Sequence, residues 1–380
     1  MKQVNVHIYP SPFKNESRML KITKTLADNN VFDKIYIIAT RESGLPERES
    51  IDDVREVVRI HGRSLEVKQG NFRKIIKTLQ WSWNICMFLR KKKANCINCH
   101  SLQVLPLCVF LKIVKSAKLI YDTHELETET ASSNGIRKYI SKIVEKILIK
   151  FVDETIVVND FIADWYQKKY KLEKVGVVKN VPYTQNGYIK RTTILSDIFK
   201  IPQDDVLFLY QGLIGYGRGI ELLLKIFSKL NTSKHIILMG YGELVEKVIE
   251  HAKVYPNIHY LKAVKPDEVV YYTSSADIGI SLIENVCLSY YLCLPNKMFE
   301  YVCCKVPVIV SDFPGMAKFI DEYNCGWKCT PTVEDAARLI EQITFDALSE
   351  KRNGAIEARK HFGWHLEEPT LLNVYKKLGF

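Results

Sequence analysis

Residues 276–312 read ADIGISLIENVCLSYYLCLPNKMFEYVCCKVPVIVSD. The pattern predicts a buried strand at 278–282, a polar and aromatic loop at 284–294, a helix opened by Pro295, and a second buried strand at 306–310. Pro295 suits the first helical position, because the N–H that proline lacks is not needed there. A helix that begins at the mouth of two parallel strands offers free amides and a positive dipole end, so the stretch predicts a Rossmann-like domain with an anion site.

The helix after this loop has Asn296 and Lys297 in its first turn, and Glu300 follows one turn later. Side chains three positions apart share a helix face, so Lys297 and Glu300 can reach one ligand. We interpret Lys297, with the backbone of 295–297, as a contact for a diphosphate and Glu300 as a contact for a ribose diol. The alternative is an ordinary solvated Lys–Glu pair.

The segments PNKMFEY (295–301) and PVIVSD (307–312) resemble the C-terminal signature of the group 1 glycosyltransferases, also called glycosyltransferase family 4. The resemblance implies a retaining enzyme that uses sugar nucleotides and has the GT-B fold, an α/β architecture of two Rossmann-like domains facing across a cleft. It also implies that Glu300 binds the nucleotide ribose and that the preceding loop meets the diphosphate and the sugar.

A glycine-rich loop, GLIGYGRG, lies between a predicted strand at 206–211 and a helix at 220–230. Gly212 and Gly215 allow the backbone to approach a phosphate closely, and Arg218 adds positive charge at the helix start. Such strand-to-helix turns are common by themselves. By resemblance, Arg218 matches the basic residue that neutralises the donor diphosphate.

The sequence departs from the family pattern at two positions. Leu292 stands where the family has the first of two glutamates separated by seven residues. Either the sugar contact is lost, or Glu284 or Tyr291 supplies it. Leu213 stands where the family has a companion arginine, so the cationic load falls on the two basic residues already named.

Further donor contacts are expected after the next two strands. Gly240 and Gly242 close a strand at 235–239, and the resemblance implies that the backbone around Val264 holds the nucleotide base. The expected donor-binding residues are thus Gly212, Gly215, Gly240, Gly242, Val264, Glu284, Pro295, Asn296 and Glu300.

A predicted strand at 119–121 ends in Asp122, Thr123, His124 and Glu125. Open parallel sheets bind ligands at the carboxyl ends of their strands. The match to a YDxHE-type motif of family 4 enzymes implies that His124 and Glu125 line the donor–acceptor cleft. The alternative is a helix-capping Asp and Thr beside a histidine satisfied within the protein.

Three basic residues are assigned to the acceptor side. Lys14 and Arg18 belong to the turn and helix after the first strand (2–9), where many relatives have a glycine-rich turn and this chain has PSPFKNES. His100 follows a strand at 96–99. The alternative for Lys14 and Arg18 is ordinary exposed surface.

A helix at 135–151 combines a lysine row with a broad apolar face. Such a basic amphipathic helix suits an anionic membrane surface. The alternative is an ordinary helix whose apolar side packs on the sheet. The expected membrane-facing residues are Lys138, Lys142, Lys146 and Lys150.

Composition and charge restrict the possible partners. The 380 residues suggest two domains, and 47% hydrophobic with 26% charged residues indicates a folded globular protein. Residues 1–190 contain 33 lysines and arginines against 20 aspartates and glutamates, whereas residues 191–380 contain 21 against 23. The first half should therefore face an acidic partner such as a membrane surface, a lipid diphosphate or nucleic acid.

No segment reaches the roughly 18 apolar residues of a membrane span, and prolines interrupt the first residues before a secretory segment. We expect a cytoplasmic protein, peripheral on the inner face of the plasma membrane, whose ten cysteines form no disulfides. Cys96-Ile-Asn-Cys99-His100 matches a c-type haem attachment pattern, but that chemistry requires export. Cys303 and Cys304 lack a second chelating pair for zinc.

The predicted domains are 1–185 on the acceptor side, a linker at 186–193, a nucleotide-sugar domain at 194–360, and a tail at 361–380 that returns to the first domain. We expect a hexosyltransferase that uses a UDP- or GDP-linked sugar, with no other cofactor and no metal. Arg218 and Lys297 would stabilise the departing diphosphate, and His124 and Glu125 would orient the sugar or acceptor without a covalent nucleophile.

The charge split suggests a lipid-linked saccharide acceptor in the synthesis of a surface polysaccharide such as capsule, O-antigen or lipopolysaccharide. One alternative is a sugar-nucleotide epimerase of the GT-B fold. A less favoured one is a basic nucleic-acid-binding protein, because the lysine row is not interleaved with stacking aromatics and we expect no nucleic acid partner. The sequence makes no prediction of oligomeric state.

Overall fold

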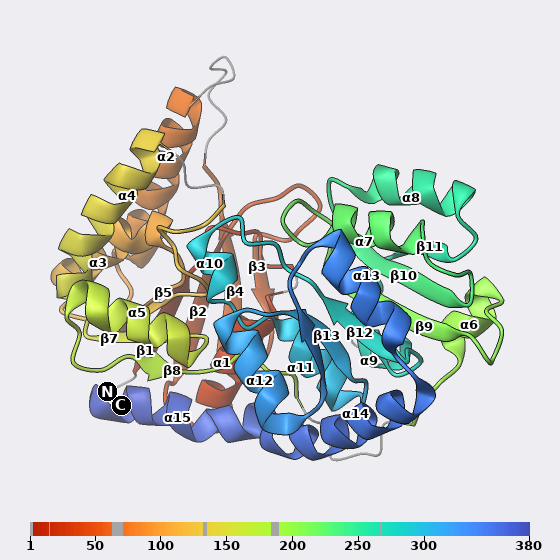
Figure 1. Cartoon of the computed structure of the whole chain (residues 1–380). Coiled ribbons are helices and arrows are strands. Elements are labelled where there is room, and N and C mark those ends of the chain that lie inside the picture. The colour runs from red at the N-terminus through yellow and green to blue at the C-terminus, as the bar shows by residue number, and fades with distance from the viewer. Residues whose placement is uncertain (1–2, 15, 63–70, 132–134, 184–189, 267) are drawn as a thin grey trace. The chain divides into compact units, whose positions relative to one another are not determined.

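The computed structural model describes residues 3–14, 16–62, 71–131, 135–183, 190–266 and 268–380. Its contacts divide the chain into two compact units (Figure 1). The first comprises Met1–Lys179 and Glu367–Phe380, and the second comprises Asn180–Leu366. Residue 185 and part of the predicted linker lie outside the described residues. No helix within the described ranges is long and apolar enough to cross a membrane.

An eight-stranded sheet forms the centre of the first unit, in the order β3-β4-β2-β1-β5-β6-β7-β8. Neighbouring strands pair in parallel, except that β3 runs antiparallel to β4. Val6 of β1, for example, pairs with Tyr36 on one side and Ile97 on the other. The strands are β1 (Val4–Ile8), β2 (Lys34–Thr40), β3 (Arg48–Ser50), β4 (Arg55–Ile60), β5 (Cys96–Cys99), β6 (Lys118–Asp122), β7 (Glu154–Val157) and β8 (Gly176–Val177).

The helices of the first unit connect these strands, and the end of the chain completes it. Tyr375 is fully buried: its ring packs against Phe32, and its hydroxyl accepts a 2.7 Å hydrogen bond from Asn98. The helices are α1 (Ser17–Asp28), α2 (Asn71–Leu89), α3 (Leu105–Lys115), α4 (Gly135–Leu148), α5 (Asp160–Tyr170) and the residues from Glu367 onward of α15 (Trp364–Lys377).

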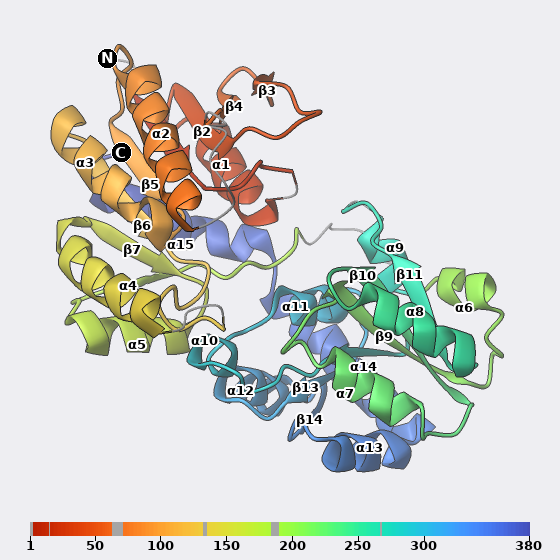
Figure 2. The ribbon, with the colours of Figure 1, turned by 90° about the horizontal axis from the view of Figure 1, so that it is seen from above.

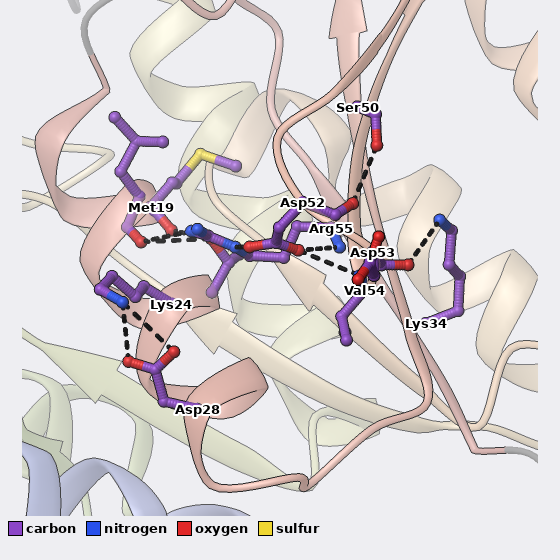
Figure 3. A network of polar contacts seen from close by, with 11 residues as sticks. Met19, Lys24, Asp28, Lys34, Ser50, Asp52, Asp53, Val54 and Arg55 are labelled. Atoms are coloured by element: carbon purple, nitrogen blue, oxygen red, sulfur yellow. Dashed lines mark hydrogen bonds and ion pairs between the residues drawn. The ribbon is translucent and has the colours of Figure 1, made fainter.

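A buried arginine ties α1 to the strands beside it (Figure 3). Arg55 begins β4, and its Nε donates to Asp52 at 2.6 Å while its Nη1 donates to the carbonyl of Leu20 in α1 at 3.3 Å. Asp52 also accepts from the backbone amides of Val54 and Arg55. The buried guanidinium of Arg55 thus has both an ionic and a backbone partner.

A six-stranded, fully parallel sheet forms the second unit, in the order β11-β10-β9-β12-β13-β14. Successive residues of β9 point to opposite faces, so Leu207 and Leu209 enter one core and Phe208 and Tyr210 the other. The strands are β9 (Val206–Leu213), β10 (Lys234–Tyr241), β11 (Ile258–Lys262), β12 (Ile278–Ser281), β13 (Val308–Ser311) and β14 (Gly326–Cys329).

Helices cover both faces of this sheet (Figure 1). One core contains residues of α7 (Ile220–Phe227), α8 (Val245–Val254) and α13 (Val333–Gln342). The opposite core contains residues of six further helices, including the end of α14. These helices are α6 (Ile194–Phe199), α9 (Val269–Thr273), α10 (Leu288–Tyr291), α11 (Asn296–Cys303), α12 (Pro314–Tyr323) and α14 (Phe345–Ala358).

Two helix starts differ from the prediction. Pro295 is the residue before α11, not its first helical residue, because its ψ of 137° is extended and the helix begins at Asn296. The apolar run at 81–90 predicts a helix that starts at Trp81, whereas α2 begins at Asn71. The apolar run that signalled this helix covers only its second half, whereas the preceding lysines and arginine are good helix formers without an apolar pattern.

Strand order reverses once in each sheet, between β1 and β5 in the first and between β9 and β12 in the second. Open α/β sheets bind ligands at the carboxyl ends of the strands that flank such a switch point. His100 directly follows β5 in the first sheet. The loop that leads from β9 to Arg218, and Glu284 after β12, lie at the corresponding edge of the second.

Candidate active site

Two cations lie at the carboxyl edge of the second sheet, each against a tyrosine ring. The guanidinium carbon of Arg218 is 4.3 Å from the centroid of Tyr290, and the Nζ of Lys297 is 3.7 Å from the centroid of Tyr210. Within the described residues neither cation has an ion pair, and the buried Nε of Arg218 lacks a hydrogen-bond partner. Neither cation is therefore neutralised by a direct ion pair, and both can bind an anion.

The two cations also influence each other. Burial and the nearby Arg218 guanidinium lower the pKa of Lys297 to about 7, and the carboxylate of Glu300 opposes this only in part. An anion bound between them would reverse the repulsion and favour the charged form of the lysine. The site is thus built for a ligand of two or more negative charges.

Glu300 is held in place by a short chain of hydrogen bonds. The side-chain amide of Gln211, at the end of β9, donates to its carboxylate at 2.5 Å. The hydroxyl of Thr273 in turn donates to the oxygen of Gln211 at 2.8 Å. Glu300 is half-buried, so its carboxylate is oriented yet accessible to a diol.

The structure distinguishes the two residues considered in place of the missing family glutamate. Glu284 accepts a 3.2 Å hydrogen bond from the backbone amide of Gly219, directly after Arg218 and at the start of α7. The ring of Tyr291 instead packs against Phe313 at 5.2 Å. Glu284 therefore lies in the site, and Tyr291 belongs to the core.

The glycines shape the loops around the cations. Gly219 has a φ of +76°, and a Cβ there would lie 2.0 Å from the carbonyl oxygen of Leu282, so only glycine fits. A Cβ on Gly212 would lie 3.9 Å from the Nζ of Lys297, so this glycine borders the site.

Four other predicted donor residues have structural roles in the described chain. Cβ atoms on Gly240 and Gly242 would lie 1.8 Å and 2.3 Å from the carbonyl oxygens of Gly212 and Ile214. These two glycines therefore let the loops after β9 and β10 pack closely. The amide of Arg218 donates to the carbonyl of Gly215, and Val264 packs on the apolar core.

A second polar cluster lies at the carboxyl edge of the first sheet, around Asp122. Arg18 is only 4% exposed, and its Nε and Nη2 both bind the Asp122 carboxylate, with the Nη2 contact at 2.6 Å. The Nδ1 of His100 lies 3.2 Å from the carboxylate, and the Nε2 of His124 lies 3.8 Å from it. His7 lies behind His100, with 2.9 Å between the facing ring nitrogens.

Two groups of this cluster have strongly shifted pKa values, which fix their protonation states near neutral pH. Despite full burial, Arg18 and the histidines keep the pKa of Asp122 well below its usual value. Burial lowers the pKa of His124 to about 3, so this imidazole is neutral at physiological pH. A neutral histidine beside an ionised carboxylate can orient a hydroxyl, but a pKa this low makes it a weak base.

His100, Asp122 and His124 bring three potential metal ligands within 4.8 Å of one another. The carboxylate, however, is already neutralised by the buried guanidinium of Arg18. A cation bound there would lie beside that guanidinium, which opposes binding. The donor set therefore fits an internal hydrogen-bond network better than a divalent metal.

This geometry corrects the expectations for the acceptor side. Arg18 is a buried partner of Asp122, not a contact for a phosphate or acceptor. His100 is 1% exposed and has both ring nitrogens engaged, so it supports His124 from behind. Lys14 forms an exposed ion pair with Glu42. Asp122 is not a helix cap. Glu125 is half-buried near Tyr9, whose pKa is raised mainly by burial and to a smaller extent by nearby glutamates that include Glu125.

The four lysines in and after α4 do not all face the solvent. Lys138 and Lys142 both turn onto Glu129, with nitrogen–oxygen distances of 2.7 Å. Lys146 and Lys150 are exposed. The expectation of four membrane-facing lysines is thus wrong for Lys138 and Lys142, because both form ion pairs with Glu129 on the preceding loop.

Sequence reasoning missed Tyr210, Gln211, Tyr290 and His7. Tyr210 and Gln211 lie at the carboxyl end of β9, directly before the glycine loop, so the switch-point argument could have found them. Tyr290 lies in a helix of one turn whose position over Arg218 depends on the folded loop.

A family described as "Glycosyl transferases group 1" matches residues 192–362, which include every cation and glycine of the second site. The second unit of the chain is thus similar to the group 1 glycosyltransferases. The chitobiosyldiphosphodolichol beta-mannosyltransferase of Candida albicans is 25% identical over 316 residues, covering 75% of this chain and 68% of the relative.

Solved structures share the fold of this chain. Sucrose-phosphate synthase from Thermosynechococcus elongatus has a TM-score of 0.83 and 15% identity, over 99% of each chain. The Anabaena protein HepE, solved with UDP-glucose, has a TM-score of 0.72 and 10% identity, over 98% of this chain and 99% of its own. At such identities the likeness shows the fold, which is GT-B, as predicted.

Proposed function

We propose that this glycosyltransferase moves a hexose from a UDP- or GDP-linked sugar to a lipid-linked saccharide. The observation that carries the proposal is the pair Arg218 and Lys297, two neighbouring cations stacked on tyrosines and without a carboxylate partner in the described chain. A sugar diphosphate supplies the missing negative charge. Both cations are partly buried in the described second unit.

The leaving diphosphate gains charge as its bond to the sugar breaks. Cations fixed before the reaction stabilise that charge without reorganising, and removing one such group typically costs about 3 kcal/mol in the transition state. Arg218 and Lys297 perform this role, assisted by the free amides at the start of α11 near Asn296. The chemistry needs no metal, so transfer should persist in EDTA.

The remaining donor contacts follow from their positions. Glu300, oriented by Gln211, binds the ribose diol. Glu284 at the Gly219 amide is placed to bind the sugar hydroxyls in place of the missing family glutamate. The backbone at Val264, beyond the end of β11, contacts the base.

His124 and Glu125 serve the sugar or acceptor from the first unit. Support for a lipid-linked acceptor comes from the name of the Candida albicans relative, which specifies a dolichol-linked diphosphate saccharide, and from the excess positive charge of residues 1–190. We place the enzyme in the cytoplasm, peripheral on the plasma membrane, in surface polysaccharide synthesis.

We further propose that the configuration at the transferred carbon is retained, without a covalent enzyme intermediate. The leaving phosphate would take the acceptor proton on the same face. The anomeric configuration of the product, determined by NMR, tests this step. A β-glycoside formed from an α-linked donor would overturn retention and agree with the β-mannosyl transfer in the relative's name.

The test of the function is release of a nucleoside diphosphate from sugar nucleotides in the presence of lipid-linked saccharides. Arg218→Ala and Glu300→Ala should each reduce kcat/KM by about 100-fold. Lys225→Ala is the matched control, because Lys225 is an exposed cation on the adjacent helix α7. Undiminished turnover in both site variants would overturn the site assignment.

Two control reactions test the alternatives. A changed sugar nucleotide formed without acceptor would identify an epimerase. Tight, strongly salt-dependent binding to oligonucleotides, without turnover of any sugar nucleotide, would identify a nucleic-acid-binding protein.

A further inference from the structure

The helix α4 is amphipathic, but it is oriented with its charged side inward. Glu145 on its inner side is fully buried and accepts hydrogen bonds from the hydroxyls of Tyr121, Tyr166 and Tyr170 at 2.5–2.9 Å. The outer side instead exposes a stripe of large apolar residues. Their exposed fractions are 76% for Ile136, 66% for Tyr139, 52% for Ile140, 41% for Ile143 and 53% for Ile147.

This orientation contradicts the expectation that the apolar side of the helix packs on the sheet. It also contradicts the expectation that all four lysines face a membrane, because Lys138 and Lys142 bind Glu129. The buried Glu145 and the Glu129 that binds two lysines fix the rotation of α4. Exposing five large apolar side chains to water is unfavourable, so the stripe calls for a partner.

Helices α2 and α3 also expose large apolar side chains. Figure 2 shows α2 beside α3. On α3, which contacts α4, Phe110, Ile113 and Val114 are 52–64% exposed. On α2, Leu79, Trp83 and Met87 recur every four residues and are 44–65% exposed. The Nζ of Lys115 at the end of α3 donates to the carbonyl of Leu89, which joins the two helices. We call these exposed residues of α2, α3 and α4 the apolar surface.

The charges around the apolar surface indicate its partner. The sequences of α2, α3 and α4 contain nine lysines and arginines and a single acidic residue, the buried Glu145. Among the described residues, Lys146 and Lys150 beside the stripe of α4, and Arg90 and Lys91 at the end of α2, are exposed and form no ion pair. Apolar stripes flanked by cations match an anionic lipid surface.

We propose that the apolar surface docks this glycosyltransferase on an anionic membrane by inserting its side chains among the lipid headgroups. Trp83 and Tyr139 suit the depth of the headgroups, because their rings are apolar and their polar atoms can remain hydrated. The lysines supply long-range attraction, and the apolar side chains supply the attachment. Membrane docking through the apolar surface does not depend on the donor site.

The test is co-sedimentation of the full chain with vesicles of phosphatidylcholine containing about 30% phosphatidylglycerol, without sugar nucleotide or acceptor. The triple variant Ile136→Ser, Ile140→Ser, Ile143→Ser should lower the partition coefficient at least about tenfold. The matched control is Val254→Ser, Tyr271→Ser, Phe345→Ser, whose residues are 61–69% exposed in the second unit. This control should bind like the wild type.

The double variant Lys146→Ala, Lys150→Ala should bind more weakly and lose part of its salt dependence. All of these positions are exposed, so the variants should fold, which circular dichroism and the Tm verify. Equal binding by the wild type and the α4 triple variant would overturn the proposal. So would wild-type dimers that the triple variant converts to monomers, with neither protein binding vesicles, because the surface would then be a self-interface.

Discussion

The ammonium of Lys297 lies 3.7 Å from the centroid of the Tyr210 ring, without a carboxylate partner among the described residues. A ring face stabilises an ammonium by roughly 0.5–2 kcal/mol, which does not offset burial beside a second cation. The pKa of Lys297 therefore falls to about 7 in the ligand-free protein. The two neighbouring cations therefore favour diphosphate binding, and they lower the stability of the ligand-free protein.

The first prediction concerns the pH dependence of donor binding. Bound diphosphate keeps Lys297 protonated, whereas the free enzyme loses this proton above pH 7. The Kd for UDP or GDP should therefore rise up to about tenfold per pH unit between pH 7.5 and pH 9. Isothermal titration calorimetry measures this slope. Lys297→Arg, which remains charged, should remove it, and a wild-type Kd that is constant over this range would contradict the assignment.

The second prediction concerns stability. Lys297 has a pKa of about 7 in the folded state, against an ordinary lysine pKa of 10.5, so the folded state binds the proton less well than the unfolded state. The folded state therefore loses stability as the pH falls from 10.5 to 7. Lys297→Met should raise the Tm of the ligand-free protein by a few degrees, and more at pH 6 than at pH 9. Differential scanning calorimetry at both values tests this. A Tm that falls at pH 6 would show that the lysine stabilises the fold.

The third prediction concerns recognition of ribose. Gln211→Leu removes the amide that orients Glu300. The wild type should bind UDP or GDP more tightly than its 2′-deoxy form, and the variant should lose about tenfold of this preference. Competition binding with the ribo and deoxy nucleotides provides the measurement. Thr273→Val removes the outer hydrogen bond of the chain and should have a smaller effect in the same direction. An unchanged preference in Gln211→Leu would exclude this role.

The fourth prediction separates Arg18 from Lys14. Arg18→Met leaves the Asp122 carboxylate buried without its cation, which should cost about 3–5 kcal/mol of unfolding free energy. Lys14→Met removes only an exposed ion pair with Glu42 and should cost at most about 1 kcal/mol. Thermal unfolding with an NMR or fluorescence probe in the first unit compares them. Similar losses in the two variants would refute the buried-pair interpretation.

Part of the candidate site could be predicted from local sequence. Arg218, Lys297 and Glu300 lie in segments whose strands, glycines and helix start have strong local signals, and the family resemblance added their chemistry. Tyr210 and Gln211 followed from the same segments but were not recognised. The ion pair of Arg18 with Asp122 could not be predicted, because these residues are 104 positions apart and meet only when β6 is placed beside α1.

The sequence alone determined the order of strands and helices, the two α/β repeats and the loop that carries Arg218, because hydrophobic periodicity and turn residues act within a few positions of the chain. It also determined that α4 has a charged and an apolar side. Only the tertiary structure decided which side is buried: Tyr121, Tyr166 and Tyr170 surround Glu145, and Glu129 holds two lysines. Periodicity specifies that two faces differ, but the partners that each face meets come from distant segments.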